Sequence, residues 1–348
     1  MQPARILSLE TAVPPHRATN DEVKAFARSV FAESLAGNRA LDRVFDSSTV
    51  EERWLAMPVD WYAADHGWAE RAGAFEPAAI ALLADVAGRA LAAAGVAAAA
   101  VDHVLCISTT GFAAPSLDAR LIGRLGLRAD VRRTPVFGWG CAGGVIGLAR
   151  AADLARLEPG RVVLCLVVEL CSLAFRPDPE PVNVIGSALF GDGAAAAVLC
   201  AGPGHEQRPS LVASGEHTWP DSLDVMGWRI DDVGFGLELR RDLPAFLAAR
   251  LRPVVDGFLD GCGLTIAGLD GVVGHPGGPK VLQAVEQALG LGPAALADSR
   301  AVLTRYGNAS AAGVLMVLRR AIDRGARGRH LMLALGPGFT AALNLLEL

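Results

Sequence analysis

The sequence predicts an α/β protein built from two similar halves. Of its 348 residues, 52% are hydrophobic and 39 are glycines, so the chain can bury a large core. Apolar runs of strand length alternate with segments of helix length along most of the chain. Because connections of helix length join the buried strands, we expect mostly parallel pairing in a sheet covered on both faces.

A repeat along the chain indicates the two halves. Two strand-like runs carry an early aspartate, Asp102 and Asp270, 168 positions apart, and a helix ending in Leu-Gly-Leu follows each run. The next helices begin at Cys141 and Asn308, 167 positions apart. Strand and helix pairs that recur at nearly one offset indicate a duplicated unit. Gly and Pro interrupt the apolar pattern near residue 205, which predicts halves at residues 1–205 and 206–348.

Composition and charge exclude several classes of function. The formal net charge is −5, and no Lys/Arg-rich block is interleaved with aromatic residues, so we expect no nucleic-acid partner. No window reaches the ~18–20 consecutive apolar residues of a membrane span, and no secretory signal pattern opens the chain. The six cysteines form no C-x-x-C pairs, which argues against a disulfide framework or a metal site. We therefore expect a soluble, cytoplasmic protein.

The first candidate for chemistry is Cys141. It lies between glycines, where an apolar segment ends and a helix-patterned run, residues 145–157, begins. Unpaired backbone N–H groups and the positive end of the helix dipole both favour a thiolate at such a position. The flanking glycines let a substrate carbonyl approach the backbone. The position alone does not separate a nucleophile from a small core residue, because free cysteines are often buried.

Asn308 and His275 supply two further polar groups. Asn308 opens the helix equivalent to that of Cys141, so both side chains can face one cleft. His275 follows a buried strand, at the edge where α/β sheets bind ligands. A thiolate can attack a thioester carbonyl, while the imidazole stabilises the thiolate and, with the amide, donates to a developing oxyanion or enolate. The set contains no carboxylate to oppose enolate charge, which suits decarboxylation of a malonyl thioester.

Five motifs give the chain a resemblance to a known family. Their order and approximate spacing resemble those of the chalcone-synthase-like type III polyketide synthases, a branch of the thiolase fold. Residues 10–15 extend the resemblance to essentially the whole chain. The motifs are Gly140–Gly144, Ala188–Ala194, Gly274–Pro279, Tyr306–Ala312 and Gly336–Thr340. The resemblance implies a thiolase fold, in which two pseudo-symmetric halves form a five-layered αβαβα core.

The resemblance also implies substrates and catalytic roles. The enzyme would be a homodimer that takes an acyl-CoA starter and malonyl-CoA as substrates, with no metal and no redox cofactor. Cys141 would hold the growing acyl chain, and His275 and Asn308 would promote decarboxylation and condensation. Phe190 would be a gatekeeper between the coenzyme A tunnel and the acyl pocket.

Binding residues follow from the same resemblance. For the coenzyme A phosphates, Arg43 is the clear counterpart of the basic residues in plant enzymes, supplemented by Arg39 and Lys280. The loop that contains Gly338 would shape the cyclisation pocket. The substrate pocket is implied to include Thr109, Cys171, Ala174, Leu237, Ser310 and Gly338.

The starter pocket departs from the plant pattern. Thr109, Cys171 and Ala174 stand at the positions that plant enzymes fill with threonines, and Leu237 stands near the position of an aromatic residue. Most of these side chains are smaller or more apolar, and residues 167–175 resemble bacterial members that make alkylresorcinols and alkylpyrones. We therefore expect a fatty acyl starter loaded on Cys141, iterative condensation with malonyl-CoA, and cyclisation to an alkylpyrone or alkylresorcinol.

Two alternatives stay open. A ketoacyl-acyl-carrier-protein synthase III shares the fold and a Cys/His/Asn set but performs a single condensation. The motifs Gly274–Pro279 and Gly336–Thr340 argue against it. A non-catalytic acyl-binding or partner-binding descendant is not expected to keep Cys141, His275 and Asn308 together. A nicotinamide-binding enzyme is disfavoured, because no Gly-x-Gly-x-x-Gly follows a first strand.

Overall fold

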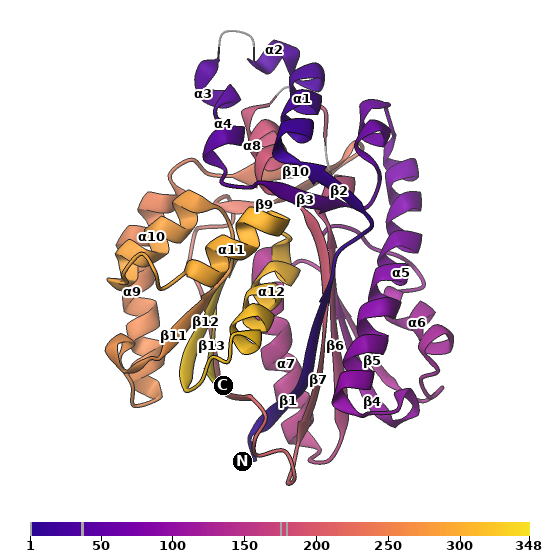
Figure 1. Cartoon of the computed structure of the whole chain (residues 1–348), viewed down its shortest axis with the longest axis vertical. Coiled ribbons are helices and arrows are strands. Elements are labelled where there is room, and N and C mark those ends of the chain that lie inside the picture. The colour runs from indigo at the N-terminus through magenta and orange to yellow at the C-terminus, as the bar shows by residue number, and fades with distance from the viewer. Residues whose placement is uncertain (1, 36–37, 175, 179) are drawn as a thin grey trace.

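The computed structural model describes residues 2–35, 38–174, 176–178 and 180–348 (Figure 1). In the N-terminal half, the strands of the central sheet are β1 (Ala4–Ala12), β4 (Val101–Ile107), β5 (Arg132–Val136), β6 (Val162–Leu170) and β7 (Asp192–Ala201). The helices that pack on these strands are α5 (Trp68–Ala94), α6 (Leu117–Leu125) and α7 (Gly143–Leu157). A smaller group of elements lies at the top of Figure 1: β2 (His16–Thr19), α1 (Asn20–Val30), α2 (Ala32–Leu35), α3 (Arg39–Asp42), α4 (Val44–Ser47), β3 (Glu52–Leu55) and α8 (Pro181–Leu189).

The C-terminal half has the same arrangement of strands and covering helices, with fewer elements outside it. Its strands in the central sheet are β8 (Ser210–Thr218), β11 (Gly271–Gly274), β12 (Arg329–Gly336) and β13 (Thr340–Glu347). A separate hairpin is formed by β9 (Met226–Asp231) and β10 (Gly234–Leu239). The helices are α9 (Leu243–Gly261), α10 (Pro279–Leu289), α11 (Ala297–Tyr306) and α12 (Ser310–Asp323).

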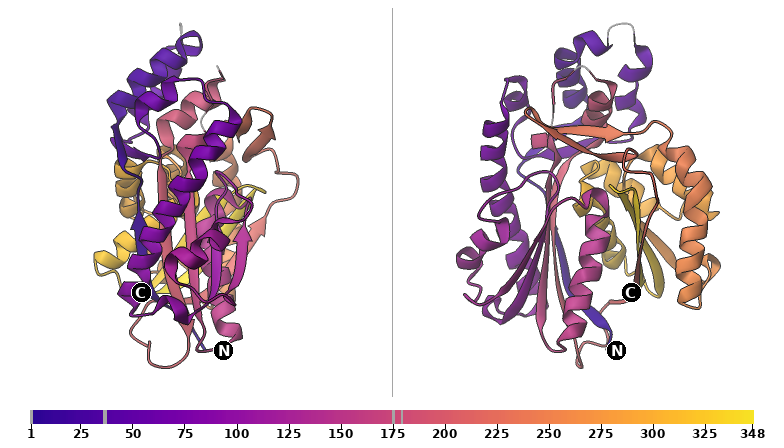
Figure 2. Two further views of the ribbon diagram at one scale, coloured as in Figure 1. Left: turned by 90° about the vertical axis from the view of Figure 1, so that its right-hand side faces the viewer. Right: turned by 180° about the vertical axis from the view of Figure 1, so that it is seen from behind.

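The two halves pack as five layers. The strand order is β11-β12-β13-β8-β1-β7-β6-β4-β5, so the halves meet where β1 pairs with β8. Helices α7 and α12 pack against each other between the two groups of strands and share one hydrophobic core with them. Helices α5 and α6 cover the outer face of one group, and α9 and α10 cover the outer face of the other (Figures 1 and 2). The five-layered αβαβα core is therefore confirmed.

The repeat predicted from the sequence appears in matching hydrogen bonds. Asp102 Oδ2 accepts from the backbone N–H of the first residue of β6 at 2.9 Å. Asp270 Oδ2 accepts in the same way from the first residue of β12 at 2.8 Å. Helices α6 and α10 both end at a glycine in the left-handed conformation, Gly126 and Gly290, which a Cβ would disfavour. The same residue types thus brace the same turns in both halves.

The expectation of mostly parallel pairing is wrong. In the described sheet, the parallel pairs are β4–β5, β4–β6 and β11–β12, and the other neighbours run antiparallel. Strand β13 follows β12 through the short turn at residues 337–339, so it must run back along its neighbour. Each half therefore combines parallel pairs at its outer edge with antiparallel pairs toward the junction.

Helix α5 is long and apolar enough to cross a membrane by length and composition alone. One such helix is weak evidence for a span, because core helices pass the same test. Its buried residues include Phe75, Leu83, Val86 and Ala90, which belong to the core cluster under the N-terminal strands. In the described structure this helix serves as the cover of one sheet face.

Candidate active site

Cys141 lies in a 3-10 turn, Gly140–Ala142, directly before α7, where the sequence predicts a helix start. The turn is tightly packed, because Gly140 has a φ of +50° and a Cβ added to it would lie 2.6 Å from the ring of Pro337. The thiol is buried, and its Sγ lies 3.8 Å from Oγ of Ser310 at the start of α12. The two equivalent helix starts therefore face each other.

Asn308 lies in the turn between α11 and α12. Its Oδ1 accepts a hydrogen bond from the backbone N–H of Ser310 at 2.9 Å. Its Nδ2 donates a long bond of 3.4 Å to the carbonyl oxygen of Gly277. The oxygen side of the amide is thus fixed, while the NH₂ group keeps donor capacity for a ligand.

His275 directly follows β11 and is 8% exposed. Within the described part of the chain, neither ring nitrogen has a hydrogen-bond partner. Packing holds the ring: a Cβ on Gly277 would lie 3.2 Å from its Cδ2, and a Cβ on Gly313 of α12 would lie 3.6 Å from its Cε1. Because buried polar atoms in native proteins are nearly always paired, the free nitrogens indicate a group available to a ligand.

Burial dominates the electrostatics of this site. It raises the pKa of the Cys141 thiol to about 12, although the Ser310 hydroxyl and the Asn308 amide act in the opposite direction. Burial also lowers the pKa of His275 to about 3. Both shifts favour the neutral forms at pH 7, so burial opposes the thiolate expected from the helix N-terminus. Loss of water around the sulfur disfavours its charged form.

The neutral Cys141 thiol and the neutral His275 imidazole both lie beside the first turn of α12. This arrangement suits a nucleophilic attack in which the thiol loses its proton as the sulfur forms its new bond. The nearby amide suits stabilisation of charge on a carbonyl oxygen. In the described ranges, no three His, Cys, Asp or Glu side chains are grouped to hold a metal ion. The thiol, the imidazole and the amide are groups that acyl transfer uses.

Thr109 lies behind the nucleophile. Its Oγ1 accepts a hydrogen bond from the backbone N–H of Gly140 at 2.9 Å, and its own N–H donates to Oε2 of Glu169 at 3.1 Å. Thr110 Oγ1 donates to the same carboxylate oxygen at 2.8 Å. Burial raises the pKa of Glu169 to about 8. These contacts brace the turn that carries the nucleophile, and Thr109 is not among the residues that line the pocket described next.

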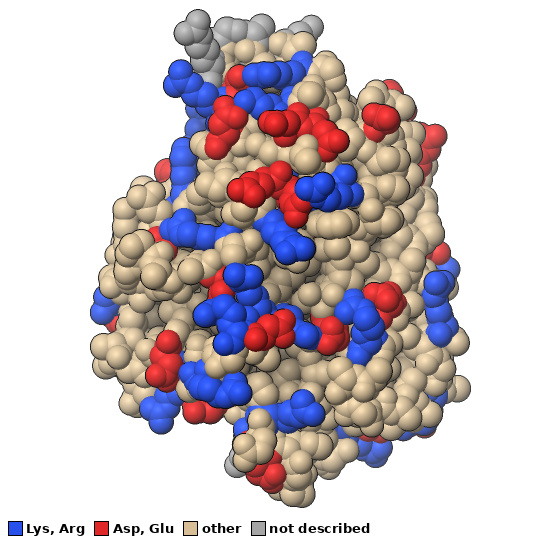
Figure 3. All heavy atoms as spheres, viewed as in Figure 1, with Lys and Arg blue, Asp and Glu red and all other residues tan. Residues whose placement is uncertain are grey.

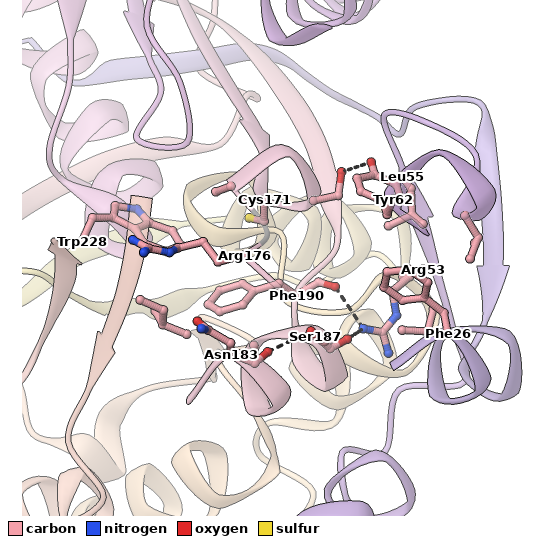
Figure 4. Close-up of a pocket in the computed structure, with 16 residues that line it drawn as sticks. Phe26, Arg53, Leu55, Tyr62, Cys171, Arg176, Asn183, Ser187, Phe190 and Trp228 are labelled. Carbon is pink, nitrogen blue, oxygen red and sulfur yellow. Dashed lines mark hydrogen bonds between the residues drawn. The ribbon is translucent and has the colours of Figure 1, made fainter. Parts of the chain in front are cut away.

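A pocket lies between α1, α8 and the β9–β10 hairpin (Figure 4). It encloses about 700 Å³, including its open mouth. Of the pocket residues predicted from the sequence, it brings together Phe190, Cys171, Ala174 and Leu237. Polar and aromatic residues that the sequence analysis did not identify also line it: Arg53, Tyr62, Ser172, Arg176, Asn183 and Trp228.

The β9–β10 hairpin forms one wall of this pocket. Trp228 and Leu237 are paired across the hairpin, and both side chains line the pocket. Arg176, which is 7% exposed, donates to the two carboxylate oxygens of Asp231 at 3.0 and 2.9 Å. Both contacts are made by Nη1, and this ion pair ties the end of β9 to the pocket wall.

Phe190 connects the pocket to the catalytic residues. Its ring lies with its centroid 6.5 Å from that of Trp228, while its backbone forms an isolated bridge with Asn308. The N–H of Asn308 donates to the carbonyl of Leu189 at 2.8 Å, and the N–H of Gly191 donates to the carbonyl of Asn308 at 3.1 Å. The end of α8 and the Asn308 turn therefore form one junction.

The loop that contains Gly338 lies next to the nucleophile. A Cβ on Gly336 would lie 2.7 Å from the backbone N of Ala142, so the loop and the Cys141 turn are in close contact. Gly338 has a φ of +134°, a conformation that residues with a Cβ rarely adopt. Gly338 and Ser310 therefore belong to two different segments, and both segments approach the turn that carries Cys141.

The residues predicted to bind coenzyme A are not gathered at the pocket. Arg43 and Lys280 are exposed, and neither has an ion-pair partner among the described side chains. The side chain of Arg39 lies outside the described residues. On the face drawn in Figure 3, Lys and Arg are interspersed with Asp and Glu. The site of the coenzyme A phosphates therefore stays a prediction.

Comparisons with known proteins show the family of the chain. The family model of chalcone and stilbene synthases matches residues 1–203 with its N-terminal domain and residues 210–347 with its C-terminal domain. A 1,3,6,8-tetrahydroxynaphthalene synthase of Streptomyces peucetius subsp. caesius is 39% identical over 98% of this chain and 92% of its own length.

Solved structures show the same fold. The 1,3,6,8-tetrahydroxynaphthalene synthase from Streptomyces coelicolor A3(2) matches with a TM-score of 0.93 and 31% identity, covering 99% of both chains. PKS-I from the brown alga Ectocarpus siliculosus matches with a TM-score of 0.94 and 28% identity, covering 100% of this chain and 98% of that chain. The single-condensation synthase considered above is thereby excluded. The chain belongs to the chalcone and stilbene synthase family and is an acyl-transferring enzyme, a type III polyketide synthase with the thiolase fold.

Proposed function

We propose that Cys141 accepts an acyl group from a coenzyme A thioester and carries it during extension with malonyl-CoA. The convergence of three side chains from the two halves supports this role. The thiol approaches Ser310 at the start of α12, Asn308 lies two residues before Ser310, and His275 packs on Gly313 one turn further along.

The proposed steps balance in atoms and charge. As Sγ of Cys141 attacks the thioester carbonyl, the thiol proton passes through the His275 imidazole to the departing coenzyme A sulfur in one concerted step. The Asn308 amide and an N–H of His275 then donate to the thioester oxygen of malonyl-CoA. The bond between its methylene carbon and its carboxylate breaks, CO₂ leaves and an enolate forms. The enolate carbon attacks the acyl group on Cys141. The chain becomes two carbons longer on coenzyme A, Cys141 leaves as a thiolate, and a proton from water restores the neutral thiol for the next round.

We further propose a fatty acyl starter and an alkylpyrone or alkylresorcinol product. The pocket wall beside Phe190 is apolar where Cys171, Ala174 and Leu237 line it. Each methylene buried in such a pocket contributes roughly 0.8 kcal/mol, so a long alkyl chain would be favoured over a short one.

The relatives favour a second product. Two of the matches above are tetrahydroxynaphthalene synthases, and a tetrahydroxynaphthalene carries no alkyl chain. An enzyme with that product needs no fatty starter. The same pocket also has polar lining residues, among them Tyr62, Ser172 and Asn183, which an alkyl chain does not require.

Product analysis separates the two candidates. The enzyme is given malonyl-CoA alone, and then malonyl-CoA with saturated acyl-CoAs from hexanoyl to palmitoyl, and products are identified by mass spectrometry. The fatty-starter proposal predicts product masses that increase with the starter. An unalkylated naphthalene from malonyl-CoA alone, with no incorporation of the acyl starters, would replace it by the second candidate.

A substitution tests the role of the pocket. Ala174→Phe fills it, so the preference should move to shorter starters at near-native stability. Leu157→Phe is the matched control, because Leu157 is 76% exposed at the end of α7. An unchanged chain-length profile in a well-folded Ala174→Phe variant would contradict the role of this pocket.

We propose that the enzyme acts as a homodimer. Phe112 and Phe137 are 58% and 44% exposed, and their ring centroids lie 5.8 Å apart. The rings of Phe235 and Trp68 continue this cluster. Exposed aromatic clusters favour burial against a second chain. Light scattering should give twice the mass of one chain, and Phe112→Glu should shift it toward the monomer. A monomeric unaltered protein would contradict this proposal.

We propose that coenzyme A thioesters are the only small molecules the reaction needs. Dialysis against EDTA should then leave malonyl-CoA consumption unchanged. A loss of activity that divalent cations restore would contradict this proposal. The cytoplasmic location also remains a prediction, which cell fractionation with an antibody tests.

A further inference from the structure

Arg53 of β3 is the bulkiest of the fully buried side chains in the described residues, with 1% exposure. None of the described ion pairs gives it a carboxylate partner, and burial lowers its pKa to about 10, so it remains protonated at pH 7. Burying a cation is costly unless its N–H groups are satisfied. The hydrogen-bond partners of these N–H groups therefore indicate the role of the Arg53 side chain.

The carbonyl oxygens at the end of α8 accept from both Nη groups of the guanidinium, whereas its buried Nε has no hydrogen-bond partner among the described residues. Nη1 donates to the carbonyls of Ser187 and Phe190, the latter at 3.2 Å (Figure 4). Nη2 donates to the carbonyl of Ala188 at 3.0 Å. Nη2 also reaches Oδ1 of Asn20 at 3.3 Å. The last carbonyls of a helix have no partner within the helix and carry the negative end of its dipole. The helix end thus takes the place of a carboxylate.

The carbonyl of Leu189, in the same segment, pairs with the backbone of the Asn308 turn and not with Arg53. Leu189 accepts from the N–H of Asn308 at 2.8 Å, and the N–H of Gly191 donates to the Asn308 carbonyl at 3.1 Å. The segment 187–191 is therefore held by Arg53 on one side and by the Asn308 backbone on the other. The junction has no spare room, because a Cβ on Gly191 would lie 2.2 Å from the carbonyl oxygen of Tyr306 and 3.3 Å from Cβ of Arg53.

We propose that Arg53 is a positioning residue for the decarboxylation step. It fixes the end of α8, so that the Asn308 amide and the Phe190 ring keep their places. A second tie strengthens the effect, since the N–H of Glu51, beside β3, donates to the carbonyl of Thr304 in α11 at 2.8 Å. The proposal rests on the proposed function of Asn308. Cys141 is carried by a different element and should not depend on this clamp.

The test compares two reactions of the same variant. Arg53→Met keeps most of the volume and removes the guanidinium. Malonyl-CoA decarboxylation without a starter should then slow by about tenfold or more per folded molecule, because small displacements of a catalytic donor have large effects on rate. Alkylation of Cys141 by iodoacetamide should stay within about twofold, because the nucleophile is undisturbed. Arg53→Lys keeps the charge and should recover part of the decarboxylation rate.

Arg156→Met is the matched control. Arg156 is a largely buried arginine of α7 that also donates to a backbone carbonyl, that of Leu211, away from the clamp. Its loss should lower Tm without changing decarboxylation per folded molecule. If Arg53→Met behaves in the same way, the positioning role is overturned.

Asn308→Ala in the same assay distinguishes a failure of the proposed function of Asn308 from a failure of the positioning role of Arg53. If Asn308→Ala decarboxylates normally, the proposed function of Asn308 fails. If Asn308→Ala is slow while Arg53→Met is normal, only the positioning role fails. Should Arg53→Met not fold, Gly191→Ala strains the same junction from the other side. Gly191→Ala and Arg53→Lys must then both slow decarboxylation, and a normal rate in either overturns the proposal.

Discussion

The turns that open α7 and α12 occupy the same place in the two halves but hold different chemistry. In the N-terminal half the turn presents Cys141, a buried thiol that approaches the hydroxyl of Ser310. In the C-terminal half it presents Asn308, whose oxygen accepts from its own turn and whose backbone pairs with the end of α8. One half offers a group that can form a covalent bond, and the other offers a donor held in one orientation.

The ends of the preceding strands differ in the same way. After β4, Thr109 and Thr110 bond to Glu169 and brace the nucleophile turn. After β11 comes His275, whose ring nitrogens have no partner among the described residues. The bracing aspartates and helix caps, by contrast, match between the halves. The frame is therefore shared, while the chemistry differs at strand ends, where α/β sheets place their ligands.

The largest effect expected from this division is that of Cys141→Ala. The variant should form no detectable polyketide, because the other cysteines lie in no equivalent turn. It should still decarboxylate malonyl-CoA, because His275 and Asn308 are unchanged. Chromatography of products and measurement of released CO₂ test both parts. Polyketide formation by this variant would show that the covalent role is not confined to the N-terminal turn.

Asn308→Ala should have the opposite profile. Loss of one donor to the developing enolate should slow malonyl-CoA decarboxylation by something on the order of 10²-fold, while starter loading on Cys141 stays near normal. Asn308→Asp, of nearly the same shape, should also be slow, because a carboxylate opposes enolate charge. Normal decarboxylation together with failed acylation would reverse the roles assigned to the two turns.

The ionisation of the thiol gives a further test. Because burial raises the pKa of Cys141 to about 12, the thiolate fraction, and with it iodoacetamide labelling, should rise about tenfold per pH unit from pH 7 to 9. His275, with a pKa lowered to about 3, stays neutral throughout this range. Peptide mapping identifies the labelled cysteine, and the partly exposed Cys262 serves as an internal control. A plateau below pH 7 would show that the thiolate expected from the sequence is present after all.

The smallest effects should come from the shared frame. Asp102→Ala and Asp270→Ala each remove a carboxylate that accepts from the first N–H of a strand, so each should lower the free energy of unfolding by about 1 kcal/mol. Asp102 also accepts from Arg128 and Arg161, so its loss should cost more. Denaturant unfolding measures both. A change in product profile without a change in stability would show that the frame takes part in the chemistry.

Local sequence was sufficient to identify the candidate catalytic residues. Cys141, His275 and Asn308 each stand beside glycines at the end of a strand or the start of a helix, and the structure brings them to one place. The positions of these three residues depend on a few neighbouring residues, which is why pattern and spacing identify them. Asp102 and Asp270 instead brace residues 60 and 59 positions away, and it was their recurrence at one offset that identified them.

Features that depend on distant contacts were not predictable in this way. The antiparallel pairs depend on which strands become neighbours, and Arg53 owes its role to a helix end more than 130 positions away. The structure places Arg53 on the buried face of β3, which no pattern in the sequence analysis had indicated. The neutral thiol of Cys141 results from burial by several elements, which no local pattern of glycines reports.

The central claim is that the N-terminal turn carries the acyl chain and the C-terminal turn serves decarboxylation. The most direct test is to incubate the wild type, Cys141→Ala and Asn308→Ala with an acyl-CoA alone and to locate the adduct by peptide mass spectrometry. We predict an acyl group on Cys141 in the wild type and in Asn308→Ala, and no adduct in Cys141→Ala. An adduct on Cys171, or its absence from Asn308→Ala, would contradict the claim.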